Sequence, residues 1–123
     1  MKKHCFENLI DELQPMLLVI QGVTRWDIEC LGLKRFLFFD KPFVVFKGKD
    51  IHIKIFKLKK KEYMARFSGV VSDSEFYRSE RWLKVNPNAI DREILLEIIG
   101  YSYKTVFAEL SEIQKMFMTA AID

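Results

Sequence analysis

Apolar residues recur at helical spacing in the first part of this chain. Between residues 3 and 19 they occur every three or four positions with acidic residues between them, which predicts an amphipathic helix. Pro15 is expected to end or kink this helix near Leu13 or Gln14, because a proline inside a helix removes a hydrogen bond and clashes with the preceding turn. Gly22 then separates the helix from the next element of the chain.

The pattern changes to that of strands in the following segment. Strands are expected over residues 23–31, 36–39, 43–46 and 51–56, with turns at 40–42 and 47–50. From residue 51 to 56 isoleucines alternate with other residues, as in a strand with one covered face, and this places His52 on the outward side. Connections this short require antiparallel neighbours, because parallel strands need a crossover of about a dozen residues or more.

Residues 57–67 return to a helical pattern and predict a short helix rich in lysine. Its inward-facing side chains are expected to be Leu58, Tyr63, Met64 and Phe67. After Ser68-Gly69 we expect a loop at residues 72–74 and two short strands at 76–77 and 82–85.

The last part of the chain predicts one long helix. Asn88 is expected to cap its N-terminus, with Asp91 three residues later as in a capping box. The helical pattern continues through Gly100, and its apolar stripe comprises Ile94, Ile98, Val106, Leu110, Ile113 and Phe117. The tail from residue 116 to 123 is expected to fray or to dock on a partner.

The resulting order of elements is α-β-β-β-(β)-α-β-β-α. A run of antiparallel strands with helices gathered on one side predicts an α+β fold, with a sheet of about five strands. The chain has 123 residues, 50% of them hydrophobic, and only 5 glycines and 3 prolines, so a single domain over residues 1–123 is expected.

The sequence predicts no targeting or membrane-spanning segment. The basic start of the chain is followed by acidic residues, and the longest apolar run, residues 16–20, is far shorter than the ~20 residues of a spanning helix. Cys5 and Cys30 form no C-x-x-C motif and fit a reducing compartment, so a cytoplasmic location is expected.

Residue types that carry catalysis or bind metals are few and scattered. Cys5 and Cys30 are expected to be buried and inert, since His4 stands at the terminus and His52 faces outward on a strand. A structural zinc site needs four closely placed cysteine or histidine ligands, and these four residues are far apart in the sequence. We therefore expect no enzymatic activity, no metal and no cofactor.

Positive charge is concentrated in the middle of the chain, where residues 34–66 hold 11 basic and 3 acidic side chains. Within the basic segment, residues 54–66, lysines near aromatic side chains can neutralise phosphates and stack bases, which indicates nucleic acid. A solvated helix face whose lysine stems cover apolar surface explains the same pattern. Contact with an acidic protein or membrane surface is a third interpretation. The candidate residues are Lys54, Lys57, Lys59, Lys60, Lys61 and Arg66.

A second candidate surface lies at residues 76–82. Tyr77, Arg78 and Arg81 are of the residue types most enriched at binding hot spots, whereas Trp82 is expected in the core. The same stretch also fits a strand whose side chains alternate between core and surface. Whether these three residues are exposed stays open at this point.

Some segments carry a family resemblance. Gly69-Val70-Val71, Arg81-Trp82-Leu83-Lys84-Val85 and Ser102-Tyr103 are similar to the MmcQ/YjbR family, and residues 22–25 with the hairpin after them look like the related TfoX N-terminal domain. The resemblance spans about residues 8–110. It implies a secretion-chaperone-like α+β fold in a small bacterial protein, and a double-wing DNA-binding role or, in the TfoX branch, competence regulation. The chain departs from the family pattern at Ser79 and Arg81, where the family has lysine and histidine.

Taken together, the sequence predicts a non-enzymatic module that binds a protein or a small ligand, as a monomer or homodimer and without a membrane partner. The alternative is a nucleic-acid-binding module that uses the basic segment.

Overall fold

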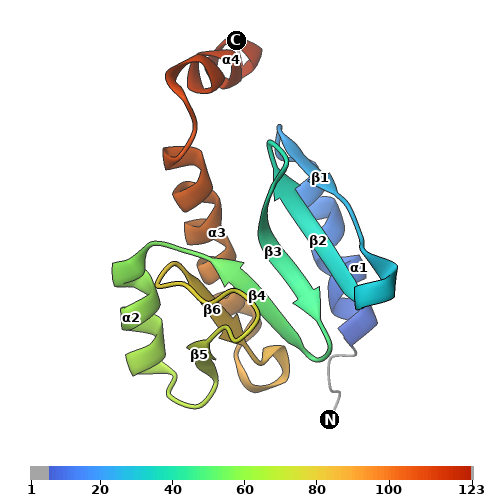
Figure 1. The fold of residues 1–123 in the computed structure, drawn as a ribbon, viewed down its shortest axis with the longest axis vertical. Coiled ribbons are helices and arrows are strands. Elements are labelled where there is room, and N and C mark those ends of the chain that lie inside the picture. Colours follow the sequence, from blue (N-terminus) through green and yellow to red (C-terminus); the bar gives the residue numbers. More distant parts are fainter. Residues whose placement is uncertain (1–5, 123) are drawn as a thin grey trace.

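The structure is a computed structural model that describes residues 6–122 (Figure 1). The helices in this part of the chain are α1 (Phe6–Leu18), α2 (Lys57–Arg66), α3 (Arg92–Ala108) and α4 (Glu112–Ile122). The strands are β1 (Val23–Arg25), β2 (Leu33–Phe38), β3 (Lys41–Lys47), β4 (Asp50–Lys54), β5 (Val71–Asp73) and β6 (Trp82–Val85). Short 3₁₀ helices occupy Glu29–Leu31 and Pro87–Ala89. Within this range, no helix has the length and apolar character needed to cross a membrane.

The six strands form one antiparallel sheet in the order β1-β2-β3-β4-β6-β5. The chain meanders from β1 to β4, leaves the sheet for α2, and then adds β5 at the edge before β6 returns beside β4. This arrangement confirms the predicted α+β class and the antiparallel pairing. The sheet has six strands, as the predicted order does when its optional strand is counted, but residues 71–73 take the place of the strand expected at 76–77.

One face of the sheet carries the main core. Alternate side chains of neighbouring strands meet there in register, as Val44 does with Ile53 and Phe46 with Ile51, and all four are fully buried. Helices α1 and α3 lie behind this face in Figure 1, and α2 lies at the β5 edge. Tyr63 links α2 to α3, because its buried hydroxyl donates a hydrogen bond of 2.6 Å to Glu97. Burial and this carboxylate raise the pKa of Tyr63.

Helix α1 continues past Pro15 to Leu18, so the prediction that it ends near Leu13 or Gln14 is wrong. Pro15 is exposed, and the carbonyl that loses its partner therefore lies on the solvent side. Leu13 and Leu17 remain on the inner side and are 1% and 3% exposed. The apolar stripe outweighs the proline in deciding where this helix ends.

The expected long C-terminal helix is two helices. Asp91, and not Asn88, is the N-cap residue of α3, and Asn88 lies in a 3₁₀ turn capped by the Asn86 side chain. Helix α3 ends at Ala108, and α4 starts with its own capping box. In this box the Gln114 N–H donates to Ser111 Oγ at 3.2 Å, and the Ser111 N–H donates to Gln114 Oε1 at 3.1 Å. Figure 1 shows α4 projecting beyond the end of the sheet.

Several side chains expected to face inward are exposed. Leu58 on α2 is 77% exposed, and Ile113 and Phe117 on α4 are 79% and 60% exposed. Met64 and Phe67 are partly buried against the core, as expected. The tail that begins at residue 116 was expected to fray or dock on a partner. Its backbone is helical up to Ile122 and Met118 is buried, so this part of α4 is not frayed.

The strand and loop between α2 and β6 are exchanged relative to the prediction. Residues 72 and 73, expected in a loop, belong to β5, whereas Phe76 and Tyr77, expected in a strand, lie in a loop.

Near the other edge of the sheet, β1 is shorter than the predicted strand over 23–31. It ends at Arg25, whose guanidinium holds Asp27 through two hydrogen bonds of 3.0 and 2.9 Å as the chain turns away.

Candidate functional site

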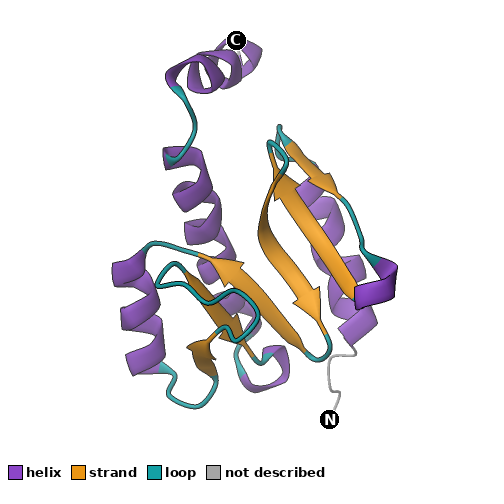
Figure 2. Ribbon diagram, viewed as in Figure 1, coloured by secondary structure: helices purple, strands orange, loops and turns teal. Residues whose placement is uncertain are grey.

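The face of the sheet turned away from α1 and α3, here called the open face, is crossed by the loop of residues 74–81 (Figure 2). A second, smaller core cluster lies there and consists of Leu33, Val45 and Trp82, with Tyr77 packed against it. The Tyr77 ring stacks on Trp82 with the centroids 3.9 Å apart and the planes at 13°. Burial raises the pKa of Tyr77. The loop is therefore held on the sheet by an aromatic anchor.

Ion pairs hold this loop at both of its ends. Near its start, Glu75 accepts a hydrogen bond of 2.7 Å from Lys84 of β6, which lowers the pKa of the Glu75 carboxyl. At its far end, Arg81 pairs with Glu109 at 2.6 Å. The loop backbone also contributes, since the Ser79 carbonyl accepts a bond of 3.0 Å from Lys60.

His52 lies on β4 beneath this loop and is 3% exposed. Its Nδ1 is 2.7 Å from Ser74 Oγ, and the same oxygen accepts a hydrogen bond of 2.8 Å from the Tyr77 N–H. The rings of Phe76 and Tyr77 make T-shaped contacts with the imidazole, with ring centroids 6.1 and 6.4 Å from that of His52. Burial lowers the pKa of His52, against the opposing effect of Glu75 and Asp50. Ser74 therefore engages Nδ1 of the ring.

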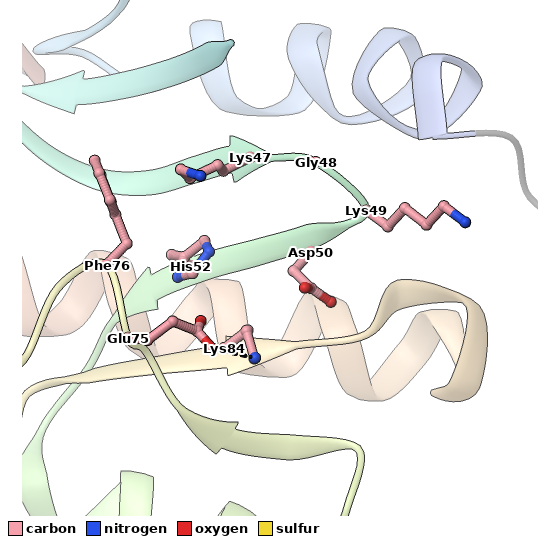
Figure 3. Close-up of a pocket in the computed structure, with 8 residues that line it drawn as sticks. All are labelled: Lys47, Gly48, Lys49, Asp50, His52, Glu75, Phe76 and Lys84. Carbon is pink, nitrogen blue, oxygen red and sulfur yellow. Dashed lines mark hydrogen bonds and ion pairs between the residues drawn. The ribbon is translucent and has the colours of Figure 1, made fainter. Parts of the chain in front are cut away.

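The open-face hollow is a cavity of about 380 Å³ that borders His52. It lies between the β3–β4 turn at Gly48-Lys49, strand β6 and the start of loop 74–81 (Figure 3). The side chains around it come from β3, β4, β6 and the loop, and they are Lys47, Asp50, His52, Glu75, Phe76 and Lys84. Residues from four separate segments thus meet at one place.

Charged groups in the hollow are nearly balanced. Lys47 reaches over Phe76, with its ammonium 5.5 Å from the ring centroid, and Lys84 is bonded to Glu75. Lys49 is in the turn, but Figure 3 shows its side chain pointing away from the other groups. Two ammonium groups therefore share the hollow with the carboxylates of Glu75 and Asp50.

A solved structure has the same fold. The chain is similar to the crystal structure of Deinococcus radiodurans protein DR2400, which contains a DUF419 domain, with a TM-score of 0.77 and 12% sequence identity. The match covers 89% of this chain and 87% of that chain. No family model matches the sequence, and no curated protein matches it. At this identity the likeness shows the fold, an α+β arrangement shared with a domain of unknown function.

The predicted basic segment is partly neutralised by acidic side chains. Among its candidate residues, Lys61 is exposed and has no ion pair with any residue that the structure describes. The others pair with carboxylates at 2.7–3.6 Å, in the pairs Lys54–Glu109, Lys57–Glu80, Lys59–Glu62, Lys60–Asp73 and Arg66–Glu62. Such pairs contribute little stability when exposed, but they reduce the net charge that a polyanion would meet.

Part of the predicted set does come together on the other side of loop 74–81. Lys60 lies between two adjoining hollows of about 450 and 240 Å³. Arg78 lines the first of these and Lys57 and Lys61 line the second. Tyr77 is separated from them, since it is half-buried on Trp82.

The predictions about cysteine and histidine are corrected in part. Cys30 is exposed, so the prediction that it is buried is wrong, while Cys5 and His4 lie outside the described residues. His52 does face away from the helices, as its alternation predicts, but loop 74–81 covers it. No cluster of three or more histidine, cysteine, aspartate or glutamate side chains suited to a metal occurs within residues 6–122.

Sequence reasoning missed the open-face hollow as a site. Its central contact pairs His52 of β4 with Lys84 of β6, two residues far apart in the chain. The alternation in residues 51–55 assigns His52 to a face, but no local pattern tells which strand becomes its neighbour. In the sheet β4 pairs with β6 and not with β5, the next strand in the chain, so the sequence order does not predict this neighbour.

Proposed function

We propose that this protein is a non-enzymatic binding module that takes a small ligand with an anionic group into the open-face hollow. The observation that carries the proposal is the convergence of Lys47, His52 and Lys84, from three adjacent strands, on one cavity beside Phe76 (Figure 3). Its volume of about 380 Å³ falls at the lower end of the range of small-molecule sites, roughly 300–1,000 Å³.

Each side chain has a distinct part in this proposal. The ammonium groups of Lys47 and Lys84 and the ring N–H of His52 supply hydrogen-bond donors for an anion. Phe76 is 40% exposed and offers apolar contact to the remainder of the ligand. Ser74 supports binding and not catalysis, because its buried hydroxyl bridges His52 and the Tyr77 N–H.

The proposal is tested by titrating the protein with phenyl phosphate at pH 6.5. Binding is monitored through the chemical shifts of the backbone amides in ¹⁵N NMR spectra. Saturable shifts are expected at residues 47–52, 75–76 and 84. Lys47→Gln is expected to weaken binding about three- to fivefold, the effect of losing about 0.6–1 kcal/mol from one exposed charge contact. The fold should be unaffected, since Lys47 is exposed.

Lys49→Gln is the matched control. It removes the same charge from the same hairpin, but its side chain points away from the hollow, so it should leave the affinity within a factor of two. Equal losses in both variants would indicate a general effect of net charge. Shifts centred on α2 instead of the hollow would place the ligand elsewhere and contradict the proposal.

Membership of the MmcQ/YjbR group, with its TfoX relatives, is part of the same proposal. The motifs between residues 69 and 103 support it, and the shared fold with the DUF419 domain is compatible with it at the level of fold. A cytoplasmic location is proposed as well, and the exposed thiol of Cys30 is in keeping with a reducing compartment.

Nucleic-acid binding through the basic segment is the alternative function. The ion pairs of that segment make it less favourable, because they reduce the positive charge available to phosphates. We expect affinity for single-stranded or duplex DNA to be weak at physiological salt. A Lys57/Lys59/Lys61→Ala variant should leave the slope of log affinity against log salt unchanged. Lys60 is kept because its side chain is 9% exposed and bonded to Asp73. A slope smaller by about one unit for each lysine removed would establish the alternative instead.

A further inference from the structure

The open-face hollow has almost no net charge while His52 is neutral. Lys47 and Lys84 face it, and so do the carboxylates of Asp50 and Glu75; Lys49 also lines it but extends its side chain away from these groups (Figure 3), so the charges that face the hollow cancel. An anion entering this cavity therefore meets no excess of positive charge from these four side chains. One further proton would change that balance, and His52 is the histidine that borders the hollow.

His52 is neutral in the empty protein near pH 7, because burial lowers its pKa. The groups that face it from neighbouring elements are of both signs: Asp50 and Glu75 favour its protonation, and Lys47 and Lys84 oppose it. Ser74, Phe76 and Tyr77 cover the ring and carry no charge at this pH. The charged neighbours offset one another, so a bound anion would add a stabilisation of the imidazolium that opposes the effect of burial.

We infer that anion binding in the open-face hollow is coupled to the uptake of a proton by His52, an inference that rests on the proposed function. Protonation gives the hollow a net positive charge, and the bound anion in turn stabilises the imidazolium. The coupling is reciprocal, so whatever factor the anion adds to proton affinity, the proton adds to anion affinity.

Ser74 suits both states of the ring. A hydroxyl can donate to the unprotonated Nδ1 and accept from the protonated one, so the 2.7 Å contact persists in either case. Nε2 carries a hydrogen in both of these states, so the ring keeps a donor for the anion when its charge changes. His52 is thus assigned as a ligand-binding residue whose charge state follows occupancy of the site.

The direction of the pH dependence follows from these states. Above the pKa of free His52, which lies below the ordinary value of 6.5, binding must bring in a proton, and the affinity falls as pH rises. Below that pKa the ring is already charged, and the affinity levels off. A shift of one pKa unit on binding corresponds to about a tenfold change in affinity.

Inorganic sulfate is the probe, because it stays doubly charged across the pH range used. The dissociation constant of the full chain is measured by ¹⁵N NMR at pH 5.5 and pH 8.0. We expect sulfate to bind at least about fivefold more tightly at pH 5.5. His52→Gln keeps an amide that can bond Ser74 but cannot titrate, and it should bind equally at both pH values.

His4→Gln removes the other histidine of the sequence and should retain the full pH dependence. Should His52→Gln fold poorly, the His52 imidazole is titrated by NMR in the unsubstituted protein, where sulfate is expected to raise its pKa. Sulfate that binds the hollow without pH dependence, or with the same dependence in His52→Gln, overturns this inference alone. Failure of both sulfate and phenyl phosphate to bind there overturns the proposed function as well.

Discussion

Leu83→Ala is expected to destabilise the protein by about 3–5 kcal/mol. Leu83 is fully buried in β6, where it pairs with Ile53 of β4 and Asp73 of β5. Truncation removes apolar surface from the core and leaves a cavity, because strands on both sides fix the backbone around the site. The midpoint of urea unfolding should fall with little change in the slope of the transition.

Leu58→Ala is the matched control for this result. The same atoms are removed, but from a side chain that is 77% exposed on α2, so the free energy of unfolding should change by less than about 0.5 kcal/mol. The sequence pattern predicts an inward Leu58, and a loss as large as that of Leu83→Ala would support that prediction over the structure. Circular dichroism of both variants before unfolding checks that each starts from the native fold.

The difference between Leu58 and Lys60 shows what helical periodicity alone cannot decide. In a ten-residue helix rich in lysine, the apolar stripe is too short to fix which side faces inward. Lys60 is 7% exposed because its ammonium reaches Asp73 and the Ser79 carbonyl while its stem covers apolar surface. Both partners come from later parts of the chain, so the local sequence contains no sign of them.

The sheet was predictable for the opposite reason. Short turns fix antiparallel neighbours from β2 to β4, and alternation assigns Ile51 and Ile53 to the covered face. The open-face hollow could not be predicted from the sequence, because it forms where the meander of strands is interrupted. Loop 74–81 connects β5 to β6, and this connection places Glu75 and Phe76 beside His52 of β4. Chemistry that is distributed over four segments leaves no spacing for a sequence pattern to detect.

The second large effect is expected at Gly22. The β2–β3 turn has positive φ at Phe39 and Asp40, 47° and 68°, as in a type I′ turn. Phenylalanine is unusual there, and the position is secured by the Phe39 N–H, which donates a hydrogen bond of 3.0 Å to the Gly22 carbonyl. The Phe39 ring lies so close to Gly22 that an added Cβ would be 2.8 Å from Cε2. The turn therefore depends on the absence of a side chain at residue 22.

Gly22→Ala is expected to destabilise the protein by about 2–5 kcal/mol, since a φ of +89° costs about 1–2 kcal/mol for alanine and overpacking adds about 1–3 kcal/mol. Gly69→Ala is the matched control, because Gly69 has a φ of +84° and no atom within 4 Å of an added Cβ. Both variants lose the same freedom in the unfolded chain, so the difference between their unfolding free energies isolates the contact of the added Cβ with the rings of Phe39 and Phe38, at 2.8 and 3.0 Å. Equal destabilisation in the two variants would mean that both rings move aside at no cost, and that the backbone alone requires glycine at residue 22.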